Sequence, residues 1–598
     1  MSTETAAARG AMARMAVALA AAITVGFHVW LVFTGLVPAM VSRPLHLALA
    51  LPWVFVIGVK GGWISRGIGS VFCLTGLAIT GWIAIDHRRI TDQYGWTEGW
   101  WQPLVCLALI LIVLDLARRA VKWVMPCVAA LCLAYAVWGD LIPGEWGHAG
   151  IPLEGILGRL VLAEGGLWGS LTGISVDLVA PFLVMGSVVA AGAAGAGFMA
   201  LATQLAGRYR AGEAKVEVVA SALYGTISGS ASANVASTGT ITIPAMIRSG
   251  YPRSFAAAVE AVASTGGQIM PPVMGAGVFL MAELLRVPYA ELMVAALLPS
   301  VLFFATVWIG IDHFAGRLGL PKLSAADLPG WRRVGTTVPF FLCPFLVLLG
   351  MLALTDYTAA YAAMLAAGIG VVMLAANSDG RLDLRGWLPR LETALVDGAQ
   401  QIAQIASIIL CASLIVGVFN MTGLGVKITS VIIGASGGML WAALLLTALA
   451  CIVLGMELPT TAAYVICVSV AGPALINLGL PPLQAHMFVF WYALLCTITP
   501  PVCGNVFIAS TIAQTPWLPV AFRAMRLGVG LFLIPLAFVL NPALLDLGER
   551  PVWALLAAVK VAVAMWFASY ALIAEAPLWR RCGAAALAIA VAGLAGIA

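Results

Sequence analysis

Charged residues are scarce in this 598-residue sequence. Asp, Glu, Lys and Arg make up only 10% of it, whereas 62% of the residues are hydrophobic; a soluble protein carries about a quarter charged residues. The net charge is +5, and the basic residues lie in short loops rather than along one face. This composition excludes an ordinary soluble domain and gives no indication of a nucleic-acid partner.

Motifs for metals, nucleotides and hydrolytic enzymes are also missing. None of the 11 cysteines forms a C-x-x-C pair, and no group of Cys and His has the spacing of a zinc site. The sequence contains no G-x-x-x-x-G-K-[ST] phosphate loop and no H-E-x-x-H motif. We therefore expect no structural metal, no cofactor and no ATP-binding loop, and we do not expect an enzyme.

Long apolar runs dominate instead, among them residues 104–114, 294–309, 338–354 and 439–456. Such runs are typical of segments buried in lipid, so we predict an all-α polytopic membrane protein. Tryptophans lie near the ends of the first apolar segments, as expected at the headgroup level. These N-terminal segments are 15–40, 45–60, 66–85, 102–118 and 121–139.

The sequence divides into three regions by composition. Residues 1–148 are predicted to form a transmembrane scaffold bundle, which a linker rich in Gly and Pro (140–155) joins to the next region. Residues 149–545 contain hydrophobic segments interrupted by Gly, Ser, Thr, Asn and Pro. Residues 546–598 add further apolar helices without a polar cluster.

Two prolines stand side by side at two places in the middle region. The stretch IMPPVMGAGVF contains Pro271 and Pro272, and the stretch ITPPVCGNVF contains Pro500 and Pro501. Proline removes a backbone donor and collides with the preceding turn, so each pair is expected to break a helix.

The two stretches belong to an internal repeat. Glycines and prolines of residues 244–275 recur in residues 473–504 at a constant offset of 229. A constant register of this kind predicts a duplicated unit, with repeat one at about 173–320 and repeat two at about 397–540.

A second interruption, rich in polar residues, precedes each Pro-Pro stretch. It is GTISGSASANVASTGTITIP (225–244) in repeat one and LGMELPTTAAY (454–464) in repeat two. Short apolar segments flank both, which predicts a re-entrant hairpin in repeat one and either a hairpin or two tight spans in repeat two. Freed carbonyls can hold a cation and freed N–H groups an anion, which indicates a site for a substrate and a coupling ion. The alternative is that small polar residues merely hold helices together.

Carboxyl groups within a membrane are costly and are therefore candidates for function. Glu260 lies about three turns before the first break, and Glu457 lies at the second polar tip. For Glu260 two roles stay open: a coupling group that carries protons, or a buried carboxyl that bonds a neighbouring helix.

At these residues the chain resembles the fused membrane component of TRAP transporters (tripartite ATP-independent periplasmic transporters), TAXI branch. The likeness lies in residues 228–283 and in the stretches MTGLG, LGMELPTTAAYV and PALINLGLPPLQAHMFVFWYALLCTITPPV. It implies an elevator-type secondary importer of the bacterial inner membrane with two inverted repeats and a small-subunit-like N-terminal region. Such a protein would take an organic acid (a dicarboxylate, a keto acid or an amino acid such as glutamate) from a periplasmic TAXI-type substrate-binding protein. A Na⁺ or H⁺ gradient would drive it, and we expect it to function as a monomer.

The resemblance also implies which residues bind ion and substrate. Those of repeat one surround the first tip and the first break: Ser228, Gly229, Ser230, Ser232, Asn234, Thr265, Gly266 and Gly267. Those of repeat two are their counterparts: Gly455, Pro459, Thr460, Thr461, Thr497 and Thr499. Cys503, Gly504 and Asn505 depart from the small apolar residues usual in the family, and Asn505 is a further candidate.

Two other functions compete with transport. The stretch Gly434-Ala435-Ser436-Gly437 matches the G-x-S-G of intramembrane serine proteases, with His486 as the candidate base. That hypothesis leaves the repeat unexplained. A channel that uses the same broken helices is the other alternative.

Overall fold

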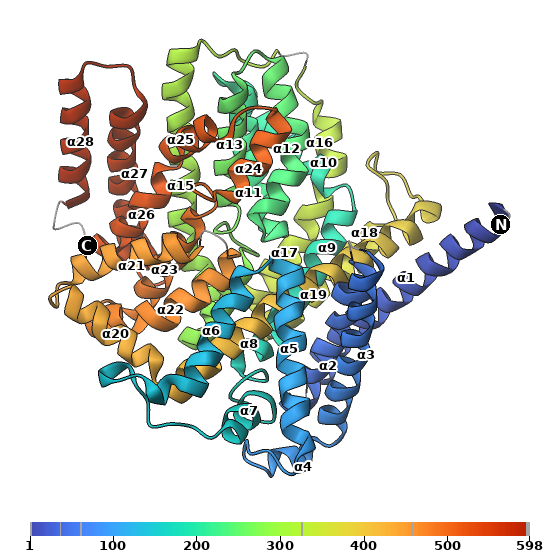
Figure 1. Ribbon diagram of the computed structural model, residues 1–598. Helices are drawn as coiled ribbons and strands as arrows, with labels where there is room; N and C mark the ends of the chain where they lie inside the picture. The colour runs from blue at the N-terminus through green and yellow to red at the C-terminus, as the bar shows by residue number, and fades with distance from the viewer. Residues whose placement is uncertain (1–2, 36, 60–61, 325–326, 456–457, 594–598) are drawn as a thin grey trace.

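A computed structural model describes residues 3–35, 37–59, 62–324, 327–455 and 458–593 (Figure 1). Apart from one isolated bridge between Ala376 and Leu382, these residues form helices and connecting turns and no β-strand. Ten of the described helices are long and apolar enough to cross a membrane, and a bent pair over residues 331–354 can supply an eleventh. The predicted all-α polytopic class is confirmed.

The N-terminal region forms six helices, and a Gly-Pro linker follows them. The helices are α1 (Thr3–Thr34), α2 (Ala39–Pro52), α3 (Trp63–Ile85), α4 (His87–Thr91), α5 (Trp101–Val121) and α6 (Val124–Trp138). The predicted first segment, 15–40, is wrong at its end. The first helix stops at Thr34 because Gly35 takes a positive φ of 73°, and the next begins directly after Pro38.

The middle region begins with α7 (Leu153–Val161) and continues through two comparable series of helices. The first series comprises α8 (Ser170–Ile174), α9 (Ala180–Ala191), α10 (Ala194–Ala206), α11 (Gly212–Ser228), α12 (Ala231–Arg248), α13 (Arg253–Gly266), α14 (Ala276–Leu285) and α15 (Tyr289–Leu318). Three helices follow: α16 (Trp331–Thr337), α17 (Pro339–Leu354) and α18 (Ala359–Met373). The second series comprises α19 (Leu384–Thr422), α20 (Leu424–Ala435), α21 (Leu440–Gly455), α22 (Thr460–Asn477), α23 (Pro482–Leu495), α24 (Gly504–Ala513), α25 (Trp517–Leu527) and α26 (Val529–Leu540).

The bounds of these helices keep the offset seen in the sequence. Helices α12 and α22 begin at residues 231 and 460, and α13 and α23 begin at 253 and 482, so each pair is 229 positions apart. Within each series two helices pack as a hairpin, α11 with α12 and α21 with α22. The series also meet reciprocally, because α12 contacts α24 while α22 contacts α14.

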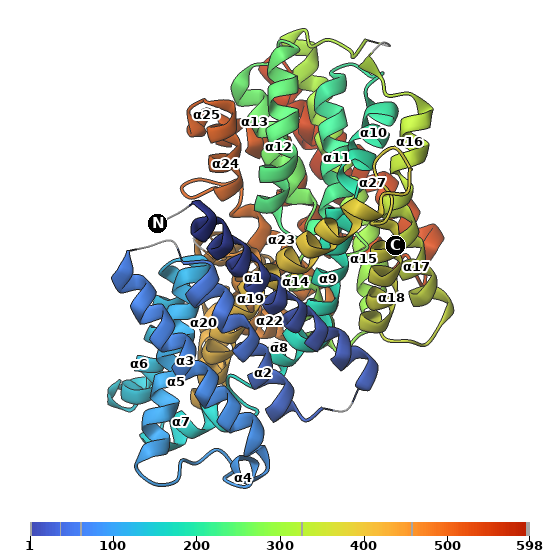
Figure 2. The same cartoon turned by 90° about the vertical axis from the view of Figure 1, so that its right-hand side faces the viewer.

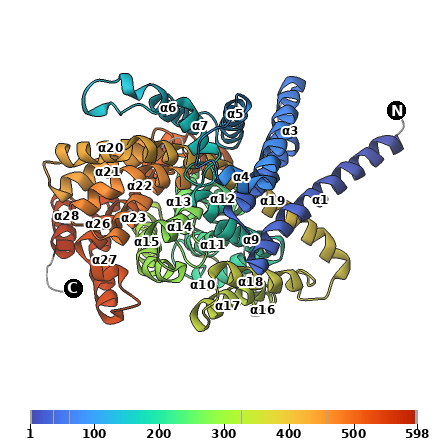
Figure 3. The ribbon, with the colours of Figure 1, turned by 90° about the horizontal axis from the view of Figure 1, so that it is seen from below.

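The 39-residue helix α19 runs through the middle of the molecule (Figure 2). It contacts α1, α2, α5 and α6 of the N-terminal region and α9 and α22 of the two helix series. Arg14 and Glu392 fasten α1 to α19 by two bonds of 2.7 Å. The last helices, α27 (Pro551–Ile573) and α28 (Leu578–Gly593), lie at the opposite side of the molecule from α1 and α3 (Figure 3). There α27 packs against α15.

Two glycines let the first hairpin approach the first broken helix. A Cβ added to Gly225 of α11 would lie 2.1 Å from the Cα of Gly267, and one added to Gly267 would lie 2.7 Å from the Cα of Gly225. Both close atoms belong to the backbone, so no side-chain movement can relieve the clash. Small residues of this kind permit close helix contact inside membranes.

We predict that Gly225→Ala separates α11 from the break and destabilises the protein by about 1–3 kcal/mol. Gly368→Ala is the matched control, because it lies in helix α18 and its added Cβ would meet no atom within 4 Å. Thermal unfolding of detergent-purified protein should show a lower melting temperature for the first variant and an unchanged or slightly higher one for the second. Equal melting temperatures would contradict this account of the packing.

Candidate functional site

Both Pro-Pro stretches lie between helices rather than within them. Helix α13 ends at Gly266 and α14 begins at Ala276, while α23 ends at Leu495 and α24 begins at Gly504. The nonhelical segments between them contain the four prolines singled out in the sequence, Pro271, Pro272, Pro500 and Pro501, and each pair is joined by a cis peptide bond. Each segment frees backbone groups that helix neighbours no longer pair.

The first polar tip sits on the first break. Ser228 ends α11, Gly229 turns the chain with a φ of 56°, and Ser230 caps α12 by accepting a 3.4 Å hydrogen bond from Ala233 N. A Cβ on Gly229 would lie 2.7 Å from the carbonyl oxygen of Met274, so the tip needs a glycine. The side chain of Gln268 donates a 3.3 Å hydrogen bond to the Gly229 carbonyl.

The described parts of the second tip are the end of α21 and the start of α22. Gly455 ends α21 and packs against Cys496 at the end of α23, where an added Cβ would lie 3.0 Å from the Cys496 Cβ. Pro459 precedes α22, which opens with Thr460 and Thr461. Glu457, the other candidate coupling carboxyl, lies outside the described residues.

Four of the candidate side chains meet where the two helix series touch. The hydroxyl groups of Thr265 and Thr497 are 3.0 Å apart. Asn505 Nδ2 donates a 2.8 Å hydrogen bond to Thr265 Oγ1, and Asn505 Oδ1 accepts a 3.0 Å bond from Ser232 Oγ. The structure therefore joins both breaks and the first tip through one polar cluster, which we call the Thr265 cluster (Ser232, Thr265, Thr497 and Asn505).

Other candidates lie elsewhere. Asn234 is completely buried below the first tip, and its Nδ2 donates a 3.1 Å bond to the Ser221 carbonyl. Gly266 lies against Phe303 of α15, which a Cβ would approach to 2.1 Å. Thr499 Oγ1 donates a 2.8 Å bond to the Leu495 carbonyl and so closes the end of α23.

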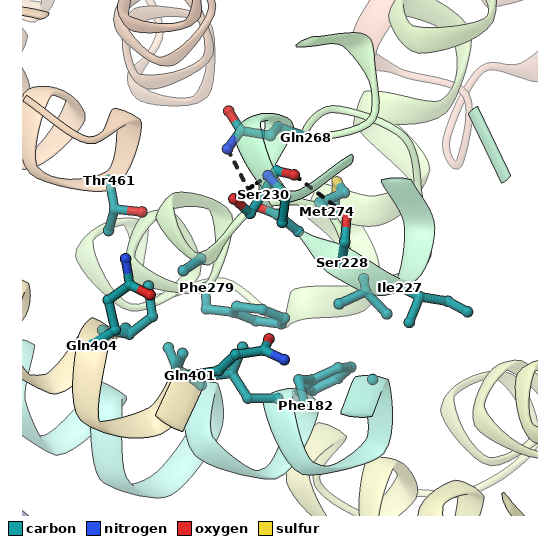
Figure 4. Close-up of a pocket in the computed structure, with 18 of the residues that line it drawn as sticks. Phe182, Ile227, Ser228, Ser230, Gln268, Met274, Phe279, Gln401, Gln404 and Thr461 are labelled. Atoms are coloured by element: carbon teal, nitrogen blue, oxygen red, sulfur yellow. Dashed lines mark hydrogen bonds between the residues drawn. The ribbon is translucent and has the colours of Figure 1, made fainter. Parts of the chain in front are cut away.

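A cavity of about 280 Å³ opens between the first tip, the first break, α9, α19 and the start of α22 (Figure 4). Ser228, Gly229, Ser230, Pro459, Thr460 and Thr461 are the candidate residues that line it. Its volume is near the lower end for small-molecule pockets and suits a small metabolite.

Sequence reasoning missed Gln268, Gln401 and Gln404, which also line this cavity. Figure 4 shows the two glutamines of α19 on the face opposite the first tip. A signal for them was present, because two amides three positions apart inside a long apolar segment are exceptional. Phe182 of α9 and Phe279 of α14 are the two phenylalanines of its apolar lining.

The described lining residues of the cavity include no charged side chain. They supply hydroxyl and amide groups instead, and two helices begin at the cavity, α12 after Ser230 and α22 after Pro459. The N–H groups of a helix start carry partial positive charge and attract anions. The cavity is thus suited to a small anion held by donors rather than by Lys or Arg.

Glu260 does not line the cavity. It is completely buried between α12 and α13, and hydroxyl groups of Thr238, Thr242 and Ser264 donate to its carboxyl oxygens at 2.7, 2.6 and 3.0 Å. Glu217 of α11, which the sequence reading passed over, is completely buried as well.

The residues of the hypothetical serine protease do not form a catalytic pair. Ser436 Oγ donates a 2.8 Å bond to the Ile433 carbonyl of its own helix. His486 Nδ1 lies 2.9 Å from the hydroxyl oxygen of Tyr464. A serine nucleophile needs a base within hydrogen-bond reach, and within the described residues no hydrogen bond joins these two.

A family model and several similar proteins point to the same family. The model of the family "Tripartite ATP-independent periplasmic transporter, DctM component" matches residues 108–552. The chain is similar to the "C4-dicarboxylate TRAP transporter large permease protein DctM" of Pseudomonas aeruginosa, with 26% identity over 338 residues, 56% of this chain and 77% of the relative. The protein of the same name from Rhodobacter capsulatus is 22% identical over 359 residues, 56% of this chain and 80% of the relative. The "Isethionate TRAP transporter permease protein DctMQ" of Oleidesulfovibrio alaskensis is 23% identical over 334 residues, 56% of this chain and 51% of the relative.

We predict that Ser232 and Asn505 are energetically coupled across the two helix series. In a double-mutant cycle of Ser232→Ala and Asn505→Ala, the free energy of unfolding in mixed micelles should show a coupling of about 1 kcal/mol. Thr511→Ala provides the control, since Thr511 lies on the same helix as Asn505 but bonds the Phe507 carbonyl of that helix. Its cycle with Ser232→Ala should be additive, and a Ser232–Asn505 cycle that is also additive would argue against the contact.

Proposed function

The chain belongs to the DctM component family of tripartite ATP-independent periplasmic transporters, and we propose that it imports a small organic acid by secondary active transport. Proteins of this family are membrane permeases and not enzymes, and they work with a periplasmic substrate-binding protein. Together with about ten apolar helices, the family places the chain in the bacterial inner membrane as a multi-pass protein.

The cavity between the helix starts is the observation that carries the substrate proposal. Hydroxyl groups of Ser228 and Thr461, the amides of Gln401 and Gln404 and the backbone at the start of α12 and α22 all face one space. Such donors hold a carboxylate without a fixed positive charge. The named substrates of two relatives, a C4-dicarboxylate and isethionate, are small organic anions as well. The proposed substrate is a dicarboxylate, a keto acid or an amino acid such as glutamate.

A cation that accompanies this anion is proposed as the driving ion, either Na⁺ or H⁺. The Thr265 cluster lies next to the freed backbone of both breaks, and it offers only oxygen and amide groups. Oxygen ligands and freed carbonyls are what an alkali cation accepts in transporters with broken helices. Binding a cation beside the anion lowers the cost of burying either charge.

We further propose an elevator movement, in which both hairpins and both broken helices cross the membrane as one body. The reciprocal contacts of α12 with α24 and of α22 with α14 support this, because they tie the two halves to each other. The N-terminal helices and the segment from about 292 to 378 would remain as the scaffold. Inverted topology of the two repeats, descent from the TAXI branch, fusion of a small subunit to the large one and function as a monomer belong to the same proposal.

We predict that Asn234→Ala and Thr461→Ala each abolish gradient-driven uptake while the protein still folds and docks its binding protein. Asn234 supports the first tip from below, and Thr461 lines the cavity. Uptake is measured in proteoliposomes supplied with purified periplasmic binding proteins that are loaded with ¹⁴C-labelled acids from a panel of dicarboxylates, keto acids and amino acids.

Thr240→Ala serves as the control for both variants, because Thr240 is an exposed residue of α12 that bonds the Ser237 carbonyl of its own helix. Normal transport by both site variants would exclude the proposed site. Counterflow of labelled acid distinguishes a carrier from a channel. With excess unlabelled acid inside, a carrier transiently concentrates the labelled acid above its outside level, whereas through an open pore the label only equilibrates.

A further inference from the structure

A pair of buried carboxyl groups where α13 packs against the first hairpin has no part in the cavity. Glu217 of α11 and Glu260 of α13 are both completely buried. Two hydroxyl groups link them: Ser221 Oγ donates to Glu217 and lies 3.2 Å from Ser264 Oγ, which donates a 3.0 Å bond to Glu260. Neither residue lines the cavity. Two ionised carboxylates next to each other in a membrane interior repel each other and lose their hydration, which is strongly unfavourable. As long as the pair is shielded from water, it therefore favours one bound positive charge.

The hydrogen bonds that Glu260 accepts stabilise its ionised form against the cost of burial. Thr238 and Ser264 donate hydrogen bonds of 2.7 and 3.0 Å to Oε1. Thr242 donates a 2.6 Å bond to Oε2. Three donors to one carboxyl group stabilise negative charge on it. Gly239 makes room for this arrangement, because a Cβ there would lie 3.1 Å from both Cγ and Cδ of Glu260.

Glu217 receives fewer hydrogen-bond donors than Glu260. The Ser221 hydroxyl donates to its Oε1. Its Oε2 is buried, and no described residue forms a hydrogen bond with that atom. A buried carboxyl oxygen that receives no donor is in the right situation to carry hydrogen itself, because a protonated carboxyl is a donor and is uncharged. The oxygen without a donor thus belongs to Glu217, whereas Glu260 receives three donors that stabilise a carboxylate.

We infer that Glu217 and Glu260 together bind one proton and that this proton crosses the membrane with the substrate as the coupling ion. The inference rests on the transport function proposed above and specifies its driving ion. The proton is held at Glu217, and Glu260 remains the carboxylate. When the hairpin reaches water on the cytoplasmic side, the proton leaves as hydronium and both carboxylates are hydrated until the next cycle.

Close polar contacts lead from the pair toward the first tip, and their hydroxyl groups can donate either to the carboxyl groups or to one another. The hydroxyl groups of Ser264 and Ser221 are 3.2 Å apart, and Thr238 Oγ1 lies 3.3 Å from Asn234 Oδ1. Asn234 also bonds the Ser221 carbonyl, and its Nδ2 lies 3.0 Å from where a Gly267 Cβ would be. Loss of the proton reorients these hydroxyl groups and with them Asn234, which lies beside the break. Proton binding and closure of the tip are linked in this way.

The other charged or titratable groups on the helices packed around the pair have partners elsewhere or lie at helix ends. Two of these groups form ion pairs, Lys215 with Asp312 and Arg317 with Glu575. Three form hydrogen bonds: Glu213 with Ser249, Arg253 with the Ala513 carbonyl and Arg523 with Ser254. His313 faces the rings of Trp566 and Tyr570. Arg248, Arg526 and Glu291 lie in the terminal turns of α12, α25 and α15. A cluster of three or more His, Cys, Asp or Glu suited to a metal ion does not occur in the described chain.

The test measures accumulation in proteoliposomes with the membrane potential held at zero, using whichever labelled acid supports uptake in the assay above. In sodium-free medium, wild-type protein should accumulate the acid when the outside is more acidic than the inside. A difference of about one pH unit can drive about tenfold accumulation at one proton per substrate. Glu217→Gln and Glu260→Gln should lose this accumulation, to an inside-to-outside ratio of about one, yet retain counterflow at equal pH. Glu213→Gln, on the same helix as Glu217 but outside the pair, should behave as wild type.

The outcomes separate the inference from the function on which it rests. Uptake driven only by a sodium gradient, whatever the pH difference, overturns the proton site and leaves organic acid import standing. The same holds if both glutamine variants accumulate the acid as wild type does. Absence of any uptake that depends on a binding protein overturns the function itself.

A spectroscopic readout keeps the proton site testable if a glutamine variant does not fold. Infrared difference spectra of wild-type protein between acidic and alkaline medium should contain the carbonyl stretch of a buried protonated carboxylic acid. Glu217→Gln should remove this band and Glu213→Gln should retain it. A wild-type spectrum without such a band overturns the inference.

Discussion

The architecture depends on one constraint: backbone N–H and C=O groups within a membrane need partners. Each Pro-Pro break interrupts a helix and frees such groups, so each break requires protein around it. The first tip rests on the first break through Gly229 and Gln268, and the Thr265 cluster joins both breaks. Close contact between Gly225 and Gly267 completes the enclosure. The polar backbone that could bind a solute is available only because these contacts hold it away from lipid.

The polar groups of the molecule gather in two places with different properties. The cavity is lined by hydroxyl and amide groups and by the starts of two helices, and its described lining has no ionised side chain. The carboxyl groups lie below the first tip, where α13 packs against the hairpin and hydroxyl groups donate to them. An anion in the cavity and a carboxyl pair behind it do not face each other directly. Asn234 bonds Ser221 and Thr238 on the side of the carboxyl groups, and its Nδ2 lies 3.0 Å from where a Cβ of Gly267 at the first break would be. In the proposed mechanism it is the residue through which occupation of one place affects the other.

The sequence predicted the parts of the site that depend on local chemistry. Paired prolines cannot continue a helix, so the breaks at Pro271 and Pro500 followed from covalent structure alone. Gly229 and the hydroxyl residues around it indicated a turn at the first tip, because glycine and Ser/Thr side chains favour turns over a continuous apolar helix. The contact of Ser232 with Asn505 joins residues 273 positions apart, and no local pattern indicates which two of many polar residues meet. Glu217 was passed over because a single carboxyl near a polar loop looks exposed until the fold buries it.

The sequence by itself determined that the chain lies in a lipid bilayer, that it is helical, where its two helices break and to which family it belongs. Hydrophobicity, proline stereochemistry and long motifs are properties of the chain and do not depend on packing. The tertiary structure decided which polar groups share a space. It placed Gln401 and Gln404 of α19 opposite the first tip, set Gly266 against Phe303 and put Glu217 beside Glu260. The physical reason is that burial and pairing of a polar group depend on neighbours that are distant in the chain, and only packing brings those neighbours together.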